Sequence, residues 1–135
     1  NPNDAAVRKD FPGGWPTDSI DKFNISNLDL KEKEAFNYFE KLANFRKTSI
    51  AISKGTLKQF IPQNGIYVYF RIHNKQTLMC VVNTNATETD LLLDRFSEVI
   101  SGVKSMKDVL NEKTINSNSS IKIPSKSFQL FELIK

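Results

Sequence analysis

A short tract near the N-terminus combines residue types that could bind a sugar. The chain's single tryptophan, Trp15, directly follows the pair Gly13-Gly14, and Arg8 and Asp10 lie a few residues before it. Glycines let a backbone approach a ligand closely, an indole ring can stack on the apolar C–H face of a sugar, and charged groups can bind its hydroxyls. The tract is a candidate binding loop. The alternative is a buried tryptophan that fills a hydrophobic gap, and from spacing alone this interpretation is favoured.

A second candidate lies on one face of a predicted strand. Tyr67, Tyr69 and Arg71 alternate with apolar residues, so a strand would place all three side chains on the same face. Such a mixed face could be a binding platform, or it could pack under the helix that precedes it in the chain. Of these two interpretations we favour packing.

The motifs of common catalytic and metal sites are absent from the sequence. It has no glycine-rich phosphate loop, no Gly-x-Ser-x-Gly elbow, and no pair of histidines or cysteines at metal-ligand spacing. The only histidine, His73, ends a predicted strand beside a turn, where we expect a solvated residue rather than a catalytic base. The only cysteine, Cys80, lies in an apolar run and is expected to be buried. We therefore predict no catalytic residue, no metal site and no cofactor.

Length and composition limit the class of protein. The chain has 135 residues and a mass of 15.4 kDa, with 39% hydrophobic and 25% charged residues, close to the averages of globular domains. This length supports one ordinary core, whereas a (β/α)₈ barrel needs about 250 residues. A complete barrel therefore does not fit within this sequence.

The distribution of charged and apolar residues argues against a nucleic-acid partner and against a membrane span. Lys and Arg exceed Asp and Glu by 19 to 15, but the basic residues are spread along the chain rather than gathered with exposed aromatics, as nucleic-acid binding requires. No apolar stretch reaches about 18 residues, so no membrane span is predicted. Two carboxylate pairs close in sequence, Glu88 with Asp90 and Asp94 with Glu98, are expected to be solvated.

The N-terminal third is expected to hold a long loop and one helix. Residues 1–28 contain three prolines and two glycines and show neither a period of two nor one of 3.6. From Leu30 to Thr48 apolar residues recur at spacings of three and four, which predicts an amphipathic helix. Asp29 and Glu32 resemble a capping box at its start. The apolar stripe covers more than one face, which predicts packing against two neighbours.

Beyond Gly55 the period changes to two, and strands are predicted. The clearest strand covers Ile66 to His73, and the Asn64-Gly65 pair before it favours a tight hairpin with a strand over 56–61. A turn then leads into a strand over residues 77–83. Its residues 78–82 are apolar on both faces, so the strand is predicted to be central in a sheet.

Further short strands are predicted toward the C-terminus. Residues 90–96 are ambiguous between a strand and a short helix, and we favour a strand. Ser105 to Glu112, Thr114 to Asn116 and Ser120 to Ile134 supply the others, with a polar turn between the last two. The fold class is mainly β: a Greek-key-like antiparallel β-sandwich of about six to eight strands, preceded by one amphipathic α-helix and a long N-terminal loop.

The order of these blocks resembles a known family. The loop Val7-Arg8-Lys9-Asp10-Phe11-Pro12-Gly13-Gly14-Trp15 is followed by a helix with Tyr38-Phe39 and Leu42-Ala43-Asn44-Phe45-Arg46-Lys47, then by Ile50-Ala51-Ile52-Ser53-Lys54-Gly55 and Gly65-Ile66-Tyr67-Val68-Tyr69-Phe70-Arg71. This order is similar to the C-terminal end of α-amylase-family glycoside hydrolases, particularly the neopullulanase and cyclomaltodextrinase type of gut anaerobes. The resemblance covers essentially the whole chain.

The resemblance implies a division of the chain. Residues 1–48 would be the last loop and the last helix of a catalytic barrel, and residues 49–135 would be a C-terminal β-sandwich domain. The family's Asp nucleophile, its Glu acid/base and its further Asp have no counterpart here. The parent chain would thus be an α-glycosidase whose catalytic residues lie upstream of Asn1. We expect this parent enzyme in a bacterial periplasm or cell envelope rather than in the cytoplasm.

The resemblance also implies partners and a small set of substrate contacts. Arg8, Asp10 and Trp15 match the family's loop beside the substrate cleft and would contact an α-glucan or maltooligosaccharide in the parent enzyme. The structural partner would be the barrel of the same parent chain. Without that barrel, one face of the helix from Leu30 to Thr48 would either self-associate or be covered by the N-terminal loop.

Two other functions are open at this point. The chain could be an autonomous carbohydrate-binding module, in which Tyr67 and Tyr69, or Trp15, stack on a glucan. It could also be a β-sandwich interaction domain unrelated to sugars.

Overall fold

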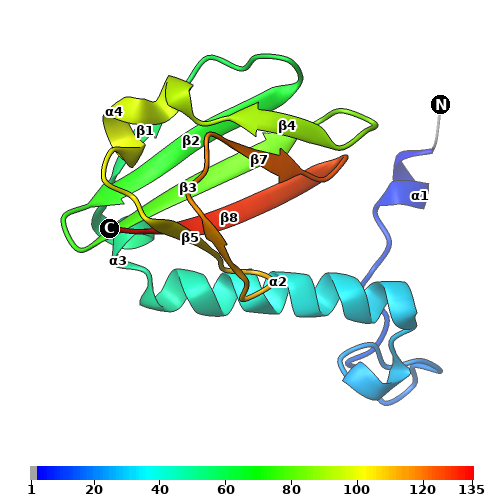
Figure 1. The fold of residues 1–135 in the computed structure, drawn as a ribbon. Helices are drawn as coiled ribbons and strands as arrows, with labels where there is room; N and C mark the ends of the chain where they lie inside the picture. The colour runs from blue at the N-terminus through cyan, green and yellow to red at the C-terminus, as the bar shows by residue number, and fades with distance from the viewer. Residues whose placement is uncertain (1–2) are drawn as a thin grey trace. The chain divides into compact units, whose positions relative to one another are not determined.

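The computed structural model describes residues 3–135, without the side chains of Ala5 and Ala6 (Figure 1). The chain forms two compact units, a first one that ends at Glu40 and a second one from Lys41 to Lys135. The boundary falls within the long helix α2, Leu30–Thr48, so each unit holds one part of that helix.

The first unit is mostly irregular, as the sequence predicts. Its long loop contains two short helical turns that the sequence did not indicate, α1 (Asp4–Val7) and the 3₁₀ turn η1 (Ile25–Asn27). Helix α2 begins where it was predicted, and its capping box is confirmed, because Asp29 N donates to Glu32 Oε2 at 2.8 Å and Glu32 N donates to Asp29 Oδ1 at 2.9 Å. No helix among residues 3–135 has the length and apolar character needed to cross a bilayer.

Helix α2 is followed at once by a short helix that periodicity did not predict. Helix α3 covers Ile50–Lys54, and Ser49 separates it from α2. The Ser49 Oγ accepts a hydrogen bond from Ile52 N at 3.2 Å, which caps α3 at its start. Ser49 therefore lies between the two helices and is the N-cap residue of α3.

The second unit contains eight antiparallel strands in two sheets. The strands are β1 (Thr56–Gln59), β2 (Ile66–His73), β3 (Gln76–Asn83), β4 (Thr89–Leu92), β5 (Ser105–Asp108), β6 (Thr114–Asn116), β7 (Ser120–Ile123) and β8 (Ser127–Ile134). The larger sheet has the order β1-β2-β3-β8-β5-β6, and β4 pairs with β7 in the smaller one (Figure 1). The predicted antiparallel β-sandwich is confirmed, and β3 is central as expected.

The β1–β2 hairpin turns at the predicted Asn-Gly pair. Asn64 and Gly65 have φ values of 51° and 73°, and Gln63 and Ile66 exchange two backbone hydrogen bonds of 3.0 and 2.9 Å around them. Positive φ at both central residues matches the right-handed twist of the flanking strands. Gly65 carries the strongest local constraint, because a Cβ there would collide with the side chain of Asn85.

The main core lies between the two sheets. The alternation predicted for β2 is confirmed, since Ile66, Val68 and Phe70 are buried while Tyr67, Tyr69 and Arg71 face the other side. Other core members come from every layer: Met79, Val81, Leu91, Leu93, Phe96, Val99, Met106, Ile121, Ile123, Phe131 and Leu133. A smaller apolar cluster on the opposite face of the large sheet contains Ala51, Leu78, Cys80 and Leu130.

The strand favoured over residues 90–96 is wrong in its second half. Strand β4 ends at Leu92, and a 3₁₀ turn η2 (Asp94–Phe96) and helix α4 (Ser97–Ile100) follow. Leu91 and Leu93 are buried at a spacing of two, but the next buried residue, Phe96, comes three positions later. In an extended strand Phe96 would face away from Leu91 and Leu93, whereas the helical turn points its side chain into the core.

Of the two long strands predicted near the C-terminus, the first is shorter than expected and the second is divided. Strand β5 ends at Asp108, whose carboxylate accepts hydrogen bonds from the backbone N–H groups of Leu110 and Asn111 at 2.9 and 3.1 Å and so stabilises a turn. The segment predicted from Ser120 to Ile134 breaks around Pro124 into β7 and β8, which belong to different sheets.

Candidate functional site

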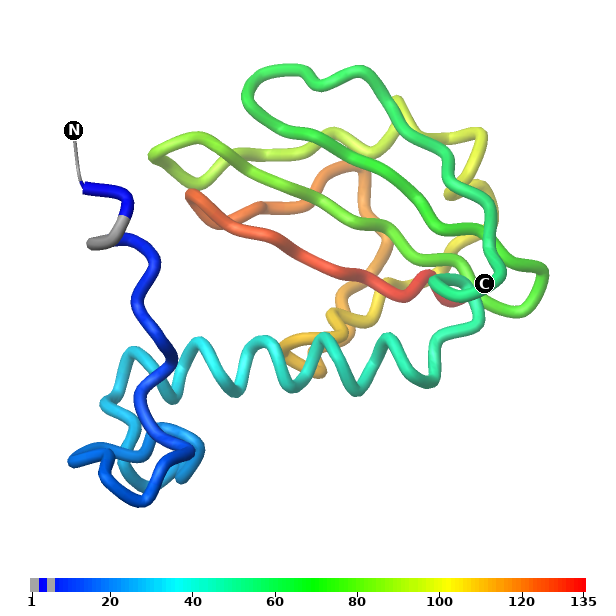
Figure 2. Tube along the Cα trace, turned by 180° about the vertical axis from the view of Figure 1, so that it is seen from behind, coloured from blue at the N-terminus to red at the C-terminus, as the bar shows by residue number. Residues whose placement is uncertain are grey.

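The N-terminal loop reverses direction at the paired glycines. Gly13 and Gly14 have φ values of 112° and 99°, in the region that favours glycine. A Cβ on Gly14 would lie 3.2 Å from the ring of Phe23, and one on Gly13 would lie 2.8 Å from Asp21 Cα. Figure 2 shows this loop doubling back on itself before α2. The glycines therefore allow the segment around residues 13–14 to lie close to the segment around residues 21–23.

Backbone hydrogen bonds and one ring pair hold the reversed loop. Lys22 N donates to Pro12 O at 2.9 Å, and the ring centroids of Phe11 and Phe23 are 4.8 Å apart. Trp15 N donates to Asp18 Oδ2 at 3.1 Å, which closes a small turn. The loop is shaped by contacts within itself.

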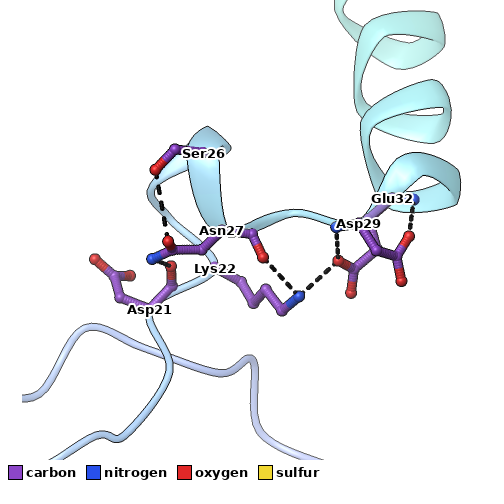
Figure 3. A network of polar contacts seen from close by, with 6 residues as sticks. All are labelled: Asp21, Lys22, Ser26, Asn27, Asp29 and Glu32. Carbon is purple, nitrogen blue, oxygen red and sulfur yellow. Dashed lines mark hydrogen bonds and ion pairs between the residues drawn. The ribbon is translucent and has the colours of Figure 1, made fainter.

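A polar network joins the loop to the first turn of α2 (Figure 3). Lys22 Nζ donates to Asn27 O at 2.9 Å and to Glu32 Oε2 at 2.7 Å, and Asn27 Nδ2 donates to Asp21 O at 2.9 Å. The hydrogen bonds from Lys22 and from the backbone of Asp29 lower the pKa of Glu32 below its ordinary value. The carboxylate that caps α2 thus also anchors the loop.

The three residues proposed as substrate contacts lie on the surface of this unit. Trp15 is 76% exposed, so the alternative of a buried, gap-filling tryptophan is wrong for this chain. Arg8 forms an exposed ion pair with Asp4 at 3.2 Å, and Asp10 is exposed. Within residues 3–135 no hydrogen bond or ion pair joins any two of Arg8, Asp10 and Trp15. The structure presents them on one loop without assembling them into a site.

The second candidate is the face with Tyr67, Tyr69 and Arg71, and two of its three residues pack against neighbouring elements. Arg71 donates from Nε to Ala51 O at 3.2 Å and from Nη2 to Ile52 O at 2.9 Å, so its guanidinium is engaged with helix α3. Tyr69 packs against the smaller apolar cluster, and burial raises its pKa well above the ordinary value. The packing interpretation is confirmed at these two residues.

The same face holds both ends of α3. The Oε1 of Gln76 accepts hydrogen bonds from Ser49 Oγ at 2.7 Å and from Ala51 N at 3.1 Å. Arg71 binds carbonyl groups of the same helix. The β2–β3 hairpin therefore gives partners to Ala51 N and Ile52 O of α3, and it adds a second hydrogen bond to Ala51 O, which already accepts one from Gly55 N. Sequence periodicity does not predict this pairing, because its partners are 19 or more residues apart.

Four other residues that the sequence singled out have structural surroundings: His73, Cys80, Glu88 and Glu98. His73 is half-buried rather than fully solvated, and its Nδ1 accepts a hydrogen bond from Lys75 N at 3.3 Å within the turn. Cys80 is buried as expected, and burial raises the pKa of its thiol. Glu88 and Glu98 form exposed ion pairs with Lys122 and Lys58. In the part of the chain that the structure describes, no cluster of three or more His, Cys, Asp or Glu residues could hold a metal ion.

Comparison with known proteins identifies the sandwich. The family model described as the cyclo-malto-dextrinase C-terminal domain matches residues 57–132, which cover β1 to most of β8. The chain belongs to this family. The resemblance to the C-terminal end of α-amylase-family enzymes, drawn from the sequence, is thereby confirmed.

Known relatives and solved structures are similar to this chain over part or most of its length. A cyclomaltodextrin glucanotransferase from Bacillus licheniformis is 33% identical over 81 residues, which are 54% of this chain and 11% of the relative. An α-amylase of Anoxybacillus superposes with a TM-score of 0.66 at 17% identity, covering 80% of this chain and 24% of that one. A complex of AmyP with maltose gives a TM-score of 0.69 at 20% identity over 81% of this chain and 22% of that one.

Proposed function

We propose that this chain is the C-terminal part of an enzyme that acts on α-glucans. The family match over residues 57–132 carries the proposal, and the short share of each relative that is matched indicates that the parent chain is much longer. In this proposal residues 49–135 are the C-terminal domain, and residues 1–48 are the last loop and last helix of a catalytic (β/α)₈ barrel. The domain stabilises that barrel and has no reaction centre of its own.

The two parts of α2 support this division. Leu42 and Phe45 pack against the smaller apolar cluster of the second unit, whereas Phe39, in the part of the helix before Glu40, is 68% exposed. Phe36 and Tyr38 in that part are also exposed. Helix α2 thus has apolar residues that are packed and apolar residues that are exposed to solvent. This is expected of a helix that lies between two bodies when only one of them is present. We propose that the second body is the catalytic barrel.

The loop before α2 is proposed to contact substrate in the parent. The exposed ring of Trp15 is available for stacking on a sugar, and Arg8 and Asp10 are exposed groups that can bind hydroxyls. The substrate class is an α-glucan or a maltooligosaccharide, in keeping with a relative named cyclomaltodextrin glucanotransferase and a neighbour bound to maltose. Within this class we propose a bacterial enzyme of the neopullulanase or cyclomaltodextrinase type.

The rival function, an autonomous carbohydrate-binding module, is less well supported. The version that uses Tyr67 and Tyr69 would need Tyr69 as an exposed stacking platform, but Tyr69 packs against the apolar cluster and Arg71 beside it is bound to α3. The version that uses Trp15 relies on the N-terminal loop and assigns no stacking role to the sandwich. Tyr67 donates from its hydroxyl to Gln59 Oε1 at 2.8 Å.

Activity assays on the natural full-length protein test the proposal. We expect the full-length protein to hydrolyse maltodextrin or pullulan and the 135-residue chain alone to give no turnover, because the chain lacks the paired carboxylates of the reaction. Stopping the full-length protein after residue 48 should lower its melting temperature and reduce its activity. A matched control stops it after Ile134, which leaves strand β8 complete, and should change little.

Two results would contradict the proposal. The first is appreciable hydrolysis by the isolated chain. The second is a full-length protein that lacks residues 49–135 and keeps its stability and activity.

A further inference from the structure

A small hollow opens at one end of the sandwich, within the second unit. It lies between the turn of the β1–β2 hairpin and the segment formed by β4 and η2, and its volume is about 330 Å³. Volumes of this order are at the lower end of those found for small-molecule sites. The hollow is remote in sequence from the N-terminal loop and shares no residue with the packed face of Tyr69 and Arg71.

The hollow has an apolar floor and a polar rim. Core residues form the floor: Ile66, Val68, Leu91 and Phe96. Hydrogen-bonding side chains form the rim: Gln63, Asn64, Thr89, Asp90, Asp94 and Arg95. Leu92, which is 67% exposed, adds an apolar group beside the rim. Such a combination of apolar surface with a few convergent polar groups is typical of binding sites.

One rim residue is held in place by its surroundings. Arg95 donates from Nη2 to Ile61 O at 2.6 Å, and its guanidinium carbon lies 6.0 and 5.8 Å from the ring centroids of Phe60 and Phe96. These contacts fix the plane of the guanidinium before any ligand arrives. They use one of its five N–H donors among residues 3–135, so donors are left for a ligand.

The other rim groups can accept hydrogen bonds from hydroxyls. The carboxylates of Asp90 and Asp94 and the side-chain amide of Gln63 make no hydrogen bond to any other residue among residues 3–135. Two carboxylates, an amide and a fixed arginine provide acceptors and donors close together, as the hydroxyls of a sugar require. The C–H face of the same sugar ring matches the apolar floor.

We propose that this hollow binds a glucosyl unit of an α-glucan chain, at a site separate from the N-terminal loop. Asp90, Asp94 and Gln63 bind its hydroxyls, Arg95 donates to a ring or hydroxyl oxygen, and the apolar floor contacts its C–H groups. The choice of glucosyl unit rests on the proposed function. The site would hold a polymer on the C-terminal domain while another part of it is processed in the barrel.

Titration of the ¹⁵N-labelled 135-residue chain with maltotriose, followed by NMR, tests the site. We expect saturable shifts confined to the amides of residues 63–66 and 89–96. The double variant Asp90→Ala with Asp94→Ala should weaken binding by about tenfold or more, because hydrogen bonds to charged groups are among the stronger polar contacts. Glu34→Ala, which removes an exposed carboxylate on α2, is the matched control and should bind as the unaltered chain does.

Three outcomes would overturn the inference: no saturable shifts, shifts that survive the double variant, or shifts centred on residues 8–15 and removed by Trp15→Ala. Cellotriose, with its β-linkages, serves as the comparison sugar in the same titration, and equal binding of maltotriose and cellotriose would remove the assignment to α-glucans. None of these results bears on whether the full-length protein is a glucan hydrolase, so the two proposals fail separately.

Discussion

The two units of this chain are stabilised by different kinds of contact. In the first unit, the loop and the start of α2 are joined by exposed, short-range polar bonds, such as those from Lys22 to Asn27 and Glu32. In the second, side chains from both sheets form a buried apolar core with Phe70 and Phe96 fully enclosed. Exposed ion pairs contribute little to stability, whereas buried aromatic rings contribute several kcal/mol each. From this difference we expect the second unit to fold without a partner and the first unit to depend on one.

The same substitution in the two units should have very different effects. Phe70→Ala removes a fully buried ring in contact with Phe60 and Phe96 and should lower the free energy of unfolding by about 3–5 kcal/mol. Phe39→Ala removes an exposed ring and should change it by less than about 0.5 kcal/mol. Urea denaturation monitored by circular dichroism measures both values. Similar losses in the two variants would refute the contrast between the units.

A buried amide should show how much the second unit depends on long-range polar contacts. Asn83 is 1% exposed, and its Nδ2 donates to Ile123 O at 3.1 Å and Pro124 O at 2.9 Å, which connects β3 to the turn between β7 and β8. Asn83→Ala leaves these carbonyls without that donor and should cost about 1–3 kcal/mol in unfolding experiments.

Asn118→Ala is the matched control, because Asn118 is exposed in a turn. It should unfold at the same urea concentration as the unaltered chain. If the two asparagine variants were equally stable, the amide of Asn83 would not join the sheets energetically.

The smallest expected effect lies in the first unit and depends on pH. The folded state lowers the pKa of Glu32, so the carboxylate stabilises the loop and the first turn of α2 above the ordinary glutamate pKa of about 4.3. This contribution is lost as the pH falls below that value and through the lower pKa of the folded state. NMR titration of the Glu32 carboxyl should give a midpoint below the ordinary value.

The hydrogen bond from Lys22 is the largest cause of the lowered pKa of Glu32, so a variant without this lysine tests the explanation directly. In the Lys22→Met variant, the titration midpoint of the Glu32 carboxyl should rise toward the ordinary glutamate value. The matched control is Lys31→Met, which removes a lysine from α2 beside Glu32 and should leave the midpoint nearly unchanged. A midpoint that is the same with and without Lys22 would show that the network in Figure 3 does not form in solution.

Local signals in the sequence were sufficient for much of this fold. The capping box at Asp29 and Glu32, the turn at Asn64-Gly65 and the alternation of Ile66 to His73 each depend on neighbouring residues, and the structure confirms all three. The turn at η2 was missed because only the position of the core shows that Phe96 must point inward.

Features that depend on distant partners could not be predicted in the same way. Gln76 and Arg71 hold helix α3 across 19 or more residues, and the hollow beside Arg95 joins a hairpin turn to a segment about 30 residues later. Neither has a period or a motif. The roles of Arg8, Asp10 and Trp15 stay predictions, since they depend on a parent enzyme whose other parts would surround the loop.

Amide hydrogen exchange, recorded by NMR or mass spectrometry on the 135-residue chain and on the natural full-length protein, decides whether residues 1–48 belong to a barrel. The helix amides from Lys31 to Glu40 should exchange rapidly in the chain alone and become strongly protected in the full-length protein, while those of β2, β3 and β8 should be protected in both. Equal exchange of Lys31 to Glu40 in the two proteins would show that this part of the helix packs against nothing upstream and would contradict the proposal.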